Sequence, residues 1–158
     1  MSLNTAAVAD PNLISRCAAR FGRQAVVVAI DARGRPGGGW EVVVRGGRDS
    51  TGREATEWAE RAVDLGAGEL LVTSIDRDGT RSGFDTDLLR AISSRVHVPV
   101  IASGGAAGPA DFIAAVRDGG ADAVLAASIF HRRIHSIAEV KAAMAAAGLP
   151  VRLPSVAA

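Results

Sequence analysis

Asp31 is the first residue of the sequence whose type and position suggest chemistry. It stands directly after the apolar run Ala25–Ile30, where a carboxylate can act as a general acid or base once its surroundings adjust its proton affinity. The same residue could equally cap a turn before Gly34. Both interpretations put Asp31 at the carboxyl-terminal mouth of a buried strand.

Two segments rich in small residues are typical of a phosphate site. Ser103–Ala106 follows an apolar run and precedes a helix expected to begin at Pro109, and Ala127–Ser128 occupies the equivalent place one unit later. Glycines such as Gly104 and Gly105 let the backbone approach an anion, and the amides of a following helix start point toward it. Each segment alone is compatible with an ordinary strand–helix turn. Together, on the last two expected strands, they favour phosphate binding.

The segment Ser74–Thr80 is the most polar one that follows an expected strand. It superficially resembles a calcium loop, but its first ligand position holds serine, its last position holds Asp85 instead of glutamate, and a strand leads into it. A better interpretation is the wall of a polyol-phosphate pocket, formed by carboxylates and backbone amides around Asp78 and Gly79. The alternative is a capped turn whose aspartates bond their own backbone.

The remaining polar residues give little support to metal chemistry. His131 and His135 lie four residues apart and would share one face of a helix, but no third ligand is near them. His97 precedes an expected strand and is expected at the surface. The single cysteine, Cys17, excludes an internal disulfide and is expected to fill core space on the first helix. We therefore expect no metal and no cofactor.

The composition argues against several classes of partner. Hydrophobic residues make up 48% and charged residues 22% of the 158 residues, a balance typical of soluble globular domains. The net charge is only +1, no charged tail is present and aromatic residues reach 4%, which argues against nucleic-acid and membrane-surface binding. The apolar runs are strand-sized and no secretory leader is recognised, so a cytoplasmic location is expected.

Short apolar runs alternate with longer amphipathic stretches along the chain. The runs predicted as buried strands are Ala25–Ile30, Glu69–Thr73, Val98–Ala102 and Ala121–Ala126. The stretches predicted as helices are Asp10–Phe21, Arg53–Leu65, Asp85–Arg95, Pro109–Asp118 and Ser136–Ala147, with N-caps at Asp85 and Ser136. Trp40–Arg45, after a glycine-rich turn, breaks the rhythm as a short extra strand or hairpin arm. Four βα units predict an α/β fold with parallel strands and outer helices.

The ends of the expected strands favour a barrel over an open doubly wound sheet. No Gly-x-Gly-x-x-Gly follows the first strand, whereas polar residues stand at the mouths of four strands, at Asp31, Ser74, Ser103 and Ser128. Four units make half of an eight-strand ring, so residues 1–158 are expected to form a single (βα)4 half-barrel domain. Within it, residues 1–23 finish a preceding βα unit with a helix, 24–147 hold the four units, and 148–158 form a tail. A half-barrel exposes two strand edges and an apolar inner face, which favours pairing with another half or with a second copy.

Five distinctive strings of residues carry a family resemblance. They are Asn4–Val8 (NTAAV), Gln24–Ala32 (QAVVVAIDA), Leu71–Gly83 (LVTSIDRDGTRSG), Ile101–Ala106 (IASGGA) and Ala123–His131 (AVLAASIFH). In this order they resemble the cyclase subunit family of imidazole glycerol phosphate synthase, whose fold is a TIM-type (βα)8 barrel. The phosphoribosyl isomerase of the same pathway shares the barrel, but the first and third strings are closer to the cyclase.

The resemblance implies a lyase of histidine biosynthesis. Ammonia from a glutaminase subunit reacts with a bis-phosphorylated ribulosyl-formimino carboxamide ribonucleotide. Cyclisation and cleavage then give imidazole glycerol phosphate and an aminoimidazole carboxamide ribonucleotide. By the resemblance, Asp31 is one of two catalytic aspartates, Asn4 and Thr5 belong to one phosphate site, and Gln24 and Glu69 lie near the ammonia entry at the opposite end. The residues that match the other phosphate site are Asp78, Gly79, Gly104, Gly105, Ala106, Ala127 and Ser128.

The match begins where the fourth strand of the family is finishing. The first catalytic aspartate and the glycines that complete the second phosphate site therefore have no counterpart in this sequence. A single aspartate cannot donate and accept protons on opposite sides of a substrate, so we expect weak or no turnover without an N-terminal half and persistent phosphate binding. A non-catalytic phosphate-binding half-barrel that pairs with a second copy is the alternative, and the isomerase is a third.

Overall fold

A computed structural model describes residues 1–152 and contains one seven-stranded sheet. Its strands are β1 (Ser2–Leu3), β2 (Val27–Gly34), β3 (Trp40–Val44), β4 (Asp49–Glu54), β5 (Glu69–Ser74), β6 (Val100–Ser103) and β7 (Ala123–Val124). The order across the sheet is β4-β3-β2-β5-β6-β7, and β1 pairs with the beginning of β2. The strands β1, β2, β5, β6 and β7 run parallel, whereas β3 and β4 form an antiparallel extension.

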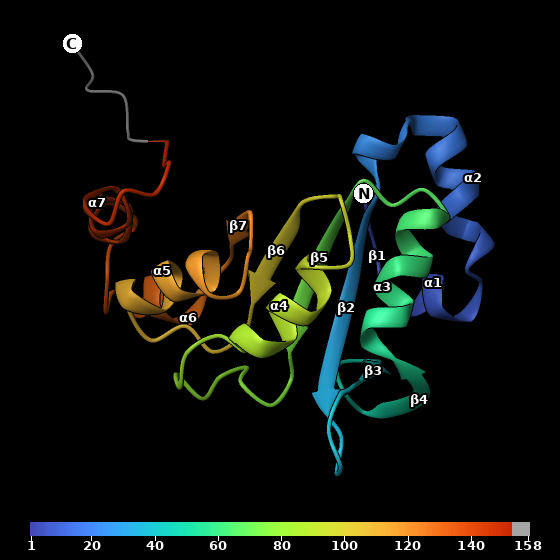
Figure 1. Cartoon of the computed structure of the whole chain (residues 1–158), viewed down its shortest axis with the longest axis horizontal. Helices are drawn as coiled ribbons and strands as arrows, with labels where there is room; N and C mark the ends of the chain where they lie inside the picture. Colours follow the sequence, from blue (N-terminus) through green and yellow to red (C-terminus); the bar gives the residue numbers. More distant parts are fainter. Residues whose placement is uncertain (153–158) are drawn as a thin grey trace.

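Helices connect the strands and cover the sheet. They are α1 (Thr5–Ala9), α2 (Asn12–Phe21), the 3-10 helix η1 (Arg23–Ala25), α3 (Ala55–Asp64), α4 (Thr86–Ser93), α5 (Pro109–Arg117), α6 (Ser128–His131) and α7 (Ile137–Ala146). Helix α3 contacts β2 and β3, α4 contacts β6, and α5 contacts β7 and α7. Figure 1 shows α7 at the end of the molecule beyond β7, and the arrowheads of β2 and β6 directed toward the same edge. Within residues 1–152, no helix combines the length and apolar character that a membrane span requires.

Alternation along the strands gives the sheet one buried and one open face. Val28, Ile30 and Ala32 of β2 are fully buried, and their register partners on β5, which include Leu70 and Val72, belong to the same core as α3 and α4. The residues between them are only partly buried. The partly buried apolar set consists of Val27, Ala29, Leu71 and Ile101. Helices therefore cover one face, and the other face stays accessible.

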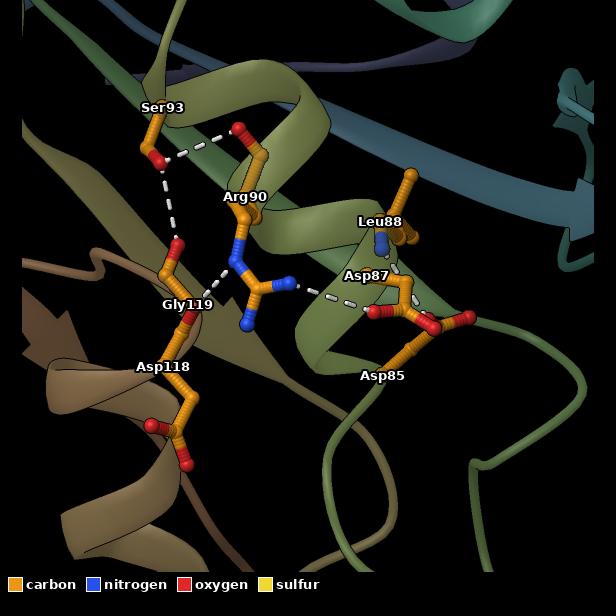
Figure 2. A network of polar contacts seen from close by, with 7 residues as sticks. All are labelled: Asp85, Asp87, Leu88, Arg90, Ser93, Asp118 and Gly119. Carbon is orange, nitrogen blue, oxygen red and sulfur yellow. Dashed lines mark hydrogen bonds and ion pairs between the residues drawn. The ribbon is translucent and has the colours of Figure 1, made fainter.

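A polar cluster joins α4 to the end of α5 (Figure 2). Arg90 Nε donates to the carbonyl oxygen of Asp118 at 2.7 Å, and Ser93 Oγ donates to that of Gly119 at 2.9 Å. The negative end of the α5 dipole favours the guanidinium at this point. A Cβ on Gly119 would lie 2.9 Å from the Cβ of Leu89 on α4, so this glycine allows α4 and the end of α5 to approach closely. The cluster fixes the spacing of two neighbouring βα units.

Most of the predicted elements are present, and their caps agree. Helices α2, α3, α4, α5 and α7 lie within the five predicted stretches. Asp85 and Ser136 cap α4 and α7 through their side chains, and Pro109 is the first residue of α5. Cys17 lies partly buried on α2 against the core, and His97 is exposed. The extra strand at Trp40 is confirmed as β3, while its partner β4 was not predicted.

Two strand ends differ from the prediction. Strand β2 does not stop at Ile30 but continues to Gly34, because β3 pairs with Asp31 and the three residues after it. Asp31 therefore lies within a strand, and the turn-cap interpretation is wrong. Strand β7 ends at Val124, so Ser128 does not close a strand but begins α6.

Candidate functional site

Asp31 and Asn4 form a hydrogen-bonded pair at one end of the open face. Asp31 is a register partner of Thr73 on β5 and is partly buried. Asn4 Nδ2 donates to Asp31 Oδ2 at 3.0 Å, which orients the carboxylate. Asn4 Oδ1 is buried and has no hydrogen-bond partner in the described part of the chain. The pair thus offers a proton-transfer group, Asp31, and an unused acceptor beside it.

A pocket of about 130 Å³ lies across the ends of the neighbouring strands. Three segments line it: Asp78, Gly79 and Arg81 after β5, Ser103–Ala106 from the last residue of β6 onward, and Leu125–Ser128 after β7. All seven residues that the resemblance assigns to one phosphate site, from Asp78 to Ser128, are among them. The structure thus brings these residues together, and phosphate binding there stays a prediction.

Backbone amides without acceptors surround this pocket. The amides of Gly79, Gly105, Ala106, Ala127 and Ser128 donate to no acceptor within residues 1–152. Backbone donors that converge on one concavity form an anion-binding nest. Ser128 starts α6, whose four residues leave the first amides without intrahelical partners.

The start of α5 contributes less to this nest than predicted. Its N-terminal amides were expected to point at the anion. Instead, the amides of Ala107 and Gly108 donate to Asp111 Oδ2 at 2.8 Å and 2.9 Å. Asp111, the third residue of α5, thus caps its own helix and withdraws both donors. These two amides, directly before α5, are therefore not free to bind an anion.

Gly104 and Gly105 are required by close backbone contacts. Gly105 has a φ of +104°, and a Cβ there would lie 2.2 Å from the carbonyl oxygen of Gly83. The amide of Gly83 in turn donates to the oxygen of Gly105 at 2.9 Å. Gly104 has a φ of +89°, and its Cβ would lie 2.8 Å from the oxygen of Ser74. The two glycines therefore hold the turn after β6 against the loop after β5.

Arg81 is a pocket residue that sequence reasoning missed. It is exposed, lines the same pocket as Asp78, and forms no ion pair within 4.0 Å among the described residues. Its φ of +56° is rare for a residue other than glycine. Its basic side chain, between Gly79 and Gly83 in a loop already interpreted as the wall of a phosphate pocket, was the feature of the sequence that could have indicated it.

The aspartates of this loop bond neighbouring segments. Asp76 Oδ2 accepts from the amide of Gly34 at 2.7 Å, so the interpretation of a turn that bonds only its own backbone is wrong for Asp76. Asp85 caps α4 and also accepts from Ser74 Oγ at 3.2 Å. Within residues 1–152, no three His, Cys, Asp or Glu side chains are close enough to share a metal ion.

The other predicted residues lie apart from the pocket. Thr5 begins α1, and its Oγ1 accepts from the amide of Arg45 at 3.3 Å, so it contacts the β3–β4 turn. Gln24 is exposed in η1, and Glu69 is the first residue of β5. Both lie at the amino-terminal edge of the sheet, opposite the pocket. Their role at an ammonia entry stays a prediction.

Known proteins resemble the chain along nearly all of its length. A family model described as histidine biosynthesis protein matches residues 1–136. The HisF subunit of imidazole glycerol phosphate synthase from Hyphomonas neptunium is 60% identical over 152 residues, or 96% of this chain and 60% of that relative. HisF subunits from two strains of Dehalococcoides mccartyi are 58% identical over 153 residues. The chain spans about 60% of the length of these curated relatives.

Proposed function

Since the chain belongs to the histidine biosynthesis protein family, we propose that it forms the carboxyl-terminal (βα)4 half of a TIM-type barrel and carries part of a cyclase active site. The reaction is the ammonia-dependent cyclisation and cleavage of a bis-phosphorylated ribulosyl-formimino carboxamide ribonucleotide. An amino-terminal half facing the open side of the sheet supplies the remaining groups. The names of the relatives, subunits of imidazole glycerol phosphate synthase, support this assignment.

The nest of free amides is the observation that carries the proposal. Five residues whose backbone amides have no acceptor within residues 1–152 line one small pocket together with Arg81, and phosphate oxygens are acceptors that such donors bind. The negative charge of the Asp78 carboxylate in the same pocket repels a phosphate dianion. Arg81 offsets that charge, so the pocket keeps its attraction for phosphate.

The open face gives the substrate a path from the pocket to the reactive carboxylate. Asp31, Thr73 and Ser103 are register partners in a row across three adjacent parallel strands. With neighbouring strands about 4.8 Å apart, Asp31 lies roughly 10 Å from the pocket wall at Ser103. A sugar phosphate held by one phosphate can extend along this row and present its reacting carbon–nitrogen groups to Asp31.

Asp31 moves a proton at the reacting end. Asn4 donates to its Oδ2, which leaves Oδ1 to exchange the proton with the substrate. One carboxylate transfers one proton at a time, whereas ring closure by ammonia and departure of the leaving group require proton transfers at separate positions. The facing half therefore provides the second acid–base group, and the present chain alone turns over weakly or not at all.

Ammonia enters from the edge of the sheet opposite the pocket. Gln24 and Glu69 stand at that edge, where polar side chains suit the docking of a glutaminase subunit. In this proposal ammonia then crosses the inside of the closed barrel, so the nucleophile and the phosphates reach the reaction from opposite ends.

The test is ammonia-dependent turnover by the chain alone and after mixing with a separately produced amino-terminal half of a HisF relative. We expect activity only in the mixture, and its loss by at least about 100-fold on Asp31→Asn, because general acid–base catalysis contributes at this scale. Asp64→Asn, at the exposed end of α3, is the matched control and should leave turnover unchanged. Equal activity of the Asp31→Asn mixture would exclude the proposed role of Asp31.

The open edges favour a second candidate function. Only β1 and β3 pair with the outer side of β2, and β7 has a free edge within the described residues. A chain with such edges can pair with its own copy and bind phosphate without catalysis. Phosphate binding with no turnover in any mixture would favour this candidate.

A further inference from the structure

The loop between β5 and α4 is bonded at both ends by the hairpin that β2 and β3 form. Gly34 and Trp40 are the last register pair before the hairpin turn. The amide of Gly34 donates to Asp76 Oδ2 at 2.7 Å, near the start of the loop. Trp40 Nε1 donates to Asp85 Oδ2 at 3.3 Å, at its end. Both residues of one hairpin pair therefore contact the same loop.

Asp85 does more than a helix cap requires. Its Oδ1 accepts from the amide of Leu88 at 3.0 Å and is sufficient to cap α4. Its Oδ2 accepts from both Trp40 and Ser74, the latter only 2% exposed. The second oxygen thus joins the beginning of β3, the end of β5 and the beginning of α4. Partial burial limits competition from water for these bonds.

The pocket wall lies between the two anchors. Asp78, Gly79 and Arg81 line the pocket, whereas neither Trp40 nor Asp85 does. On its inner side the loop bonds the turn after β6 through the amide of Gly83 and the oxygen of Gly105. The loop is thus held between the hairpin on one side and the glycine turn on the other.

We infer that the β2–β3 hairpin positions the phosphate pocket, with Trp40 and Asp85 as the positioning residues. They hold the wall from Asp78 to Arg81 at the distance from Gly105 that a phosphate group requires. The inference rests on the proposed phosphate site. It gives a structural role to β3, the strand that interrupts the regular βα repeat.

Phosphate titration of two variants tests the inference. Trp40→Phe removes the indole donor and keeps an aromatic ring, and Asp85→Asn keeps an oxygen for capping α4 but loses the carboxylate that accepts from Trp40 and Ser74. We expect inorganic phosphate to bind each variant about tenfold more weakly, as for the loss of one hydrogen bond to a charged group. Trp58→Phe is the matched control, because Trp58 Nε1 is buried without a hydrogen-bond partner.

Tryptophan fluorescence supplies a readout that a purely structural role would not change. The chain has two tryptophans, so Trp58→Phe leaves Trp40 as the single emitter. Because Trp40 does not line the pocket, a shift of its emission on adding phosphate reports a change transmitted to the hairpin from the pocket. We expect a saturable shift with the affinity found by calorimetry, and its loss on Asp85→Asn.

The outcomes separate the inference from the proposed function. The inference would be overturned, and the phosphate site left intact, if the unchanged chain and both variants bound phosphate equally strongly and the emission of Trp40 did not shift on adding phosphate. Failure of the unchanged chain to bind phosphate would refute the proposed site, and the inference with it. Weaker binding by Trp40→Phe and Asp85→Asn but not by Trp58→Phe would support both.

Discussion

Gly105 combines two reasons for having no side chain. Its φ of +104° lies in the left-handed region. A Cβ would also overlap the carbonyl oxygen of Gly83, a backbone atom that cannot shift as easily as the end of a side chain. Gly37 also has a positive φ, +96°, but nothing lies within 4 Å of the position of its Cβ. The two glycines therefore separate the conformational cost of a side chain from the steric one.

We expect Gly105→Ala to lower the free energy of unfolding by about 2–4 kcal/mol, because conformational strain and overlap with backbone add. Gly37→Ala should lower it by only about 1 kcal/mol through strain alone. Urea denaturation of both variants measures the difference. Equal losses would mean that the loop at Gly83 yields to the new methyl group.

At the residue scale, the sequence predicts which residues line the pocket better than it predicts which of their backbone and side-chain groups are free to bind a ligand. The small residues and the Asp78-Gly79 pair of the pocket were found from their places after expected strands, and all of them line the pocket. The amides of Ala107 and Gly108, directly before α5, donate to Asp111. This competition between a helix cap and a ligand depends on the folded helix and is not evident from residue types alone. Arg81 was missed because its contribution depends on a loop conformation with positive φ.

Among the elements, α3 begins at a carboxylate cap that should be visible in the pH dependence of stability. Glu54 Oε2 accepts from the amides of Thr56 and Glu57 at 2.7 Å and 3.0 Å. Burial raises the pKa of Glu54, but these hydrogen bonds and that of the Thr56 hydroxyl together outweigh it and hold the pKa below its ordinary value of 4.5. Folding therefore favours the charged form of Glu54.

A carboxyl with a lowered pKa contributes stability above the pKa of the unfolded chain, and loses it as the pH falls through the folded-state pKa. We expect Glu54→Gln to lower the free energy of unfolding by about 0.5–1 kcal/mol at pH 7, allowing for solvent screening. The gap to the unchanged chain should close as the pH falls below 4.5. Denaturation at pH 7 and at pH 3 checks this.

Glu57→Gln is the control for the same change of charge one turn into α3. Glu57 is exposed, and its side chain accepts no hydrogen bond within residues 1–152. A pH-independent gap for Glu54→Gln, or an equal pH dependence for Glu57→Gln, would argue against the cap as the source.

Elements with strong periodicity or caps were predictable, and those that depend on a distant partner were not. Asp85, Pro109 and Ser136 marked three helix starts correctly. Strand β4, with the sequence Asp49–Glu54, has no apolar alternation and forms because β3 pairs with it. The same long-range pairing extends β2 beyond Asp31, so the position of the candidate catalytic residue was misjudged by a few residues.

At the scale of the whole molecule, the open face of the sheet carries apolar side chains that no helix covers. Leu71 and Ile101 are register partners on this face, and Leu125 beside the edge strand β7 is 46% exposed. Burying apolar surface and pairing a free strand edge both favour association. Local sequence signals predict the individual βα units. They do not predict how these units form a closed barrel, because closure depends on which chain pairs with the edge strands.

We expect the chain by itself to form a dimer or a larger assembly in solution, as measured by light scattering at micromolar concentration. Leu71→Lys and Ile101→Lys each put a charge on the open face, where burial against a second copy would require its desolvation. Both variants should shift the population to monomer. Ser94→Lys adds the same charge at the exposed end of α4 and should leave the assembly unchanged.

The amino-terminal half of a HisF relative should compete for the same face. Adding it to the unchanged chain should replace the self-assembly by a one-to-one complex, because the two partners cover the same apolar row on β5 and β6. The Lys variants should form neither species. A stable monomer of the unchanged chain would mean that the open face tolerates water, and an assembly insensitive to Leu71→Lys would locate the contact elsewhere on the molecule.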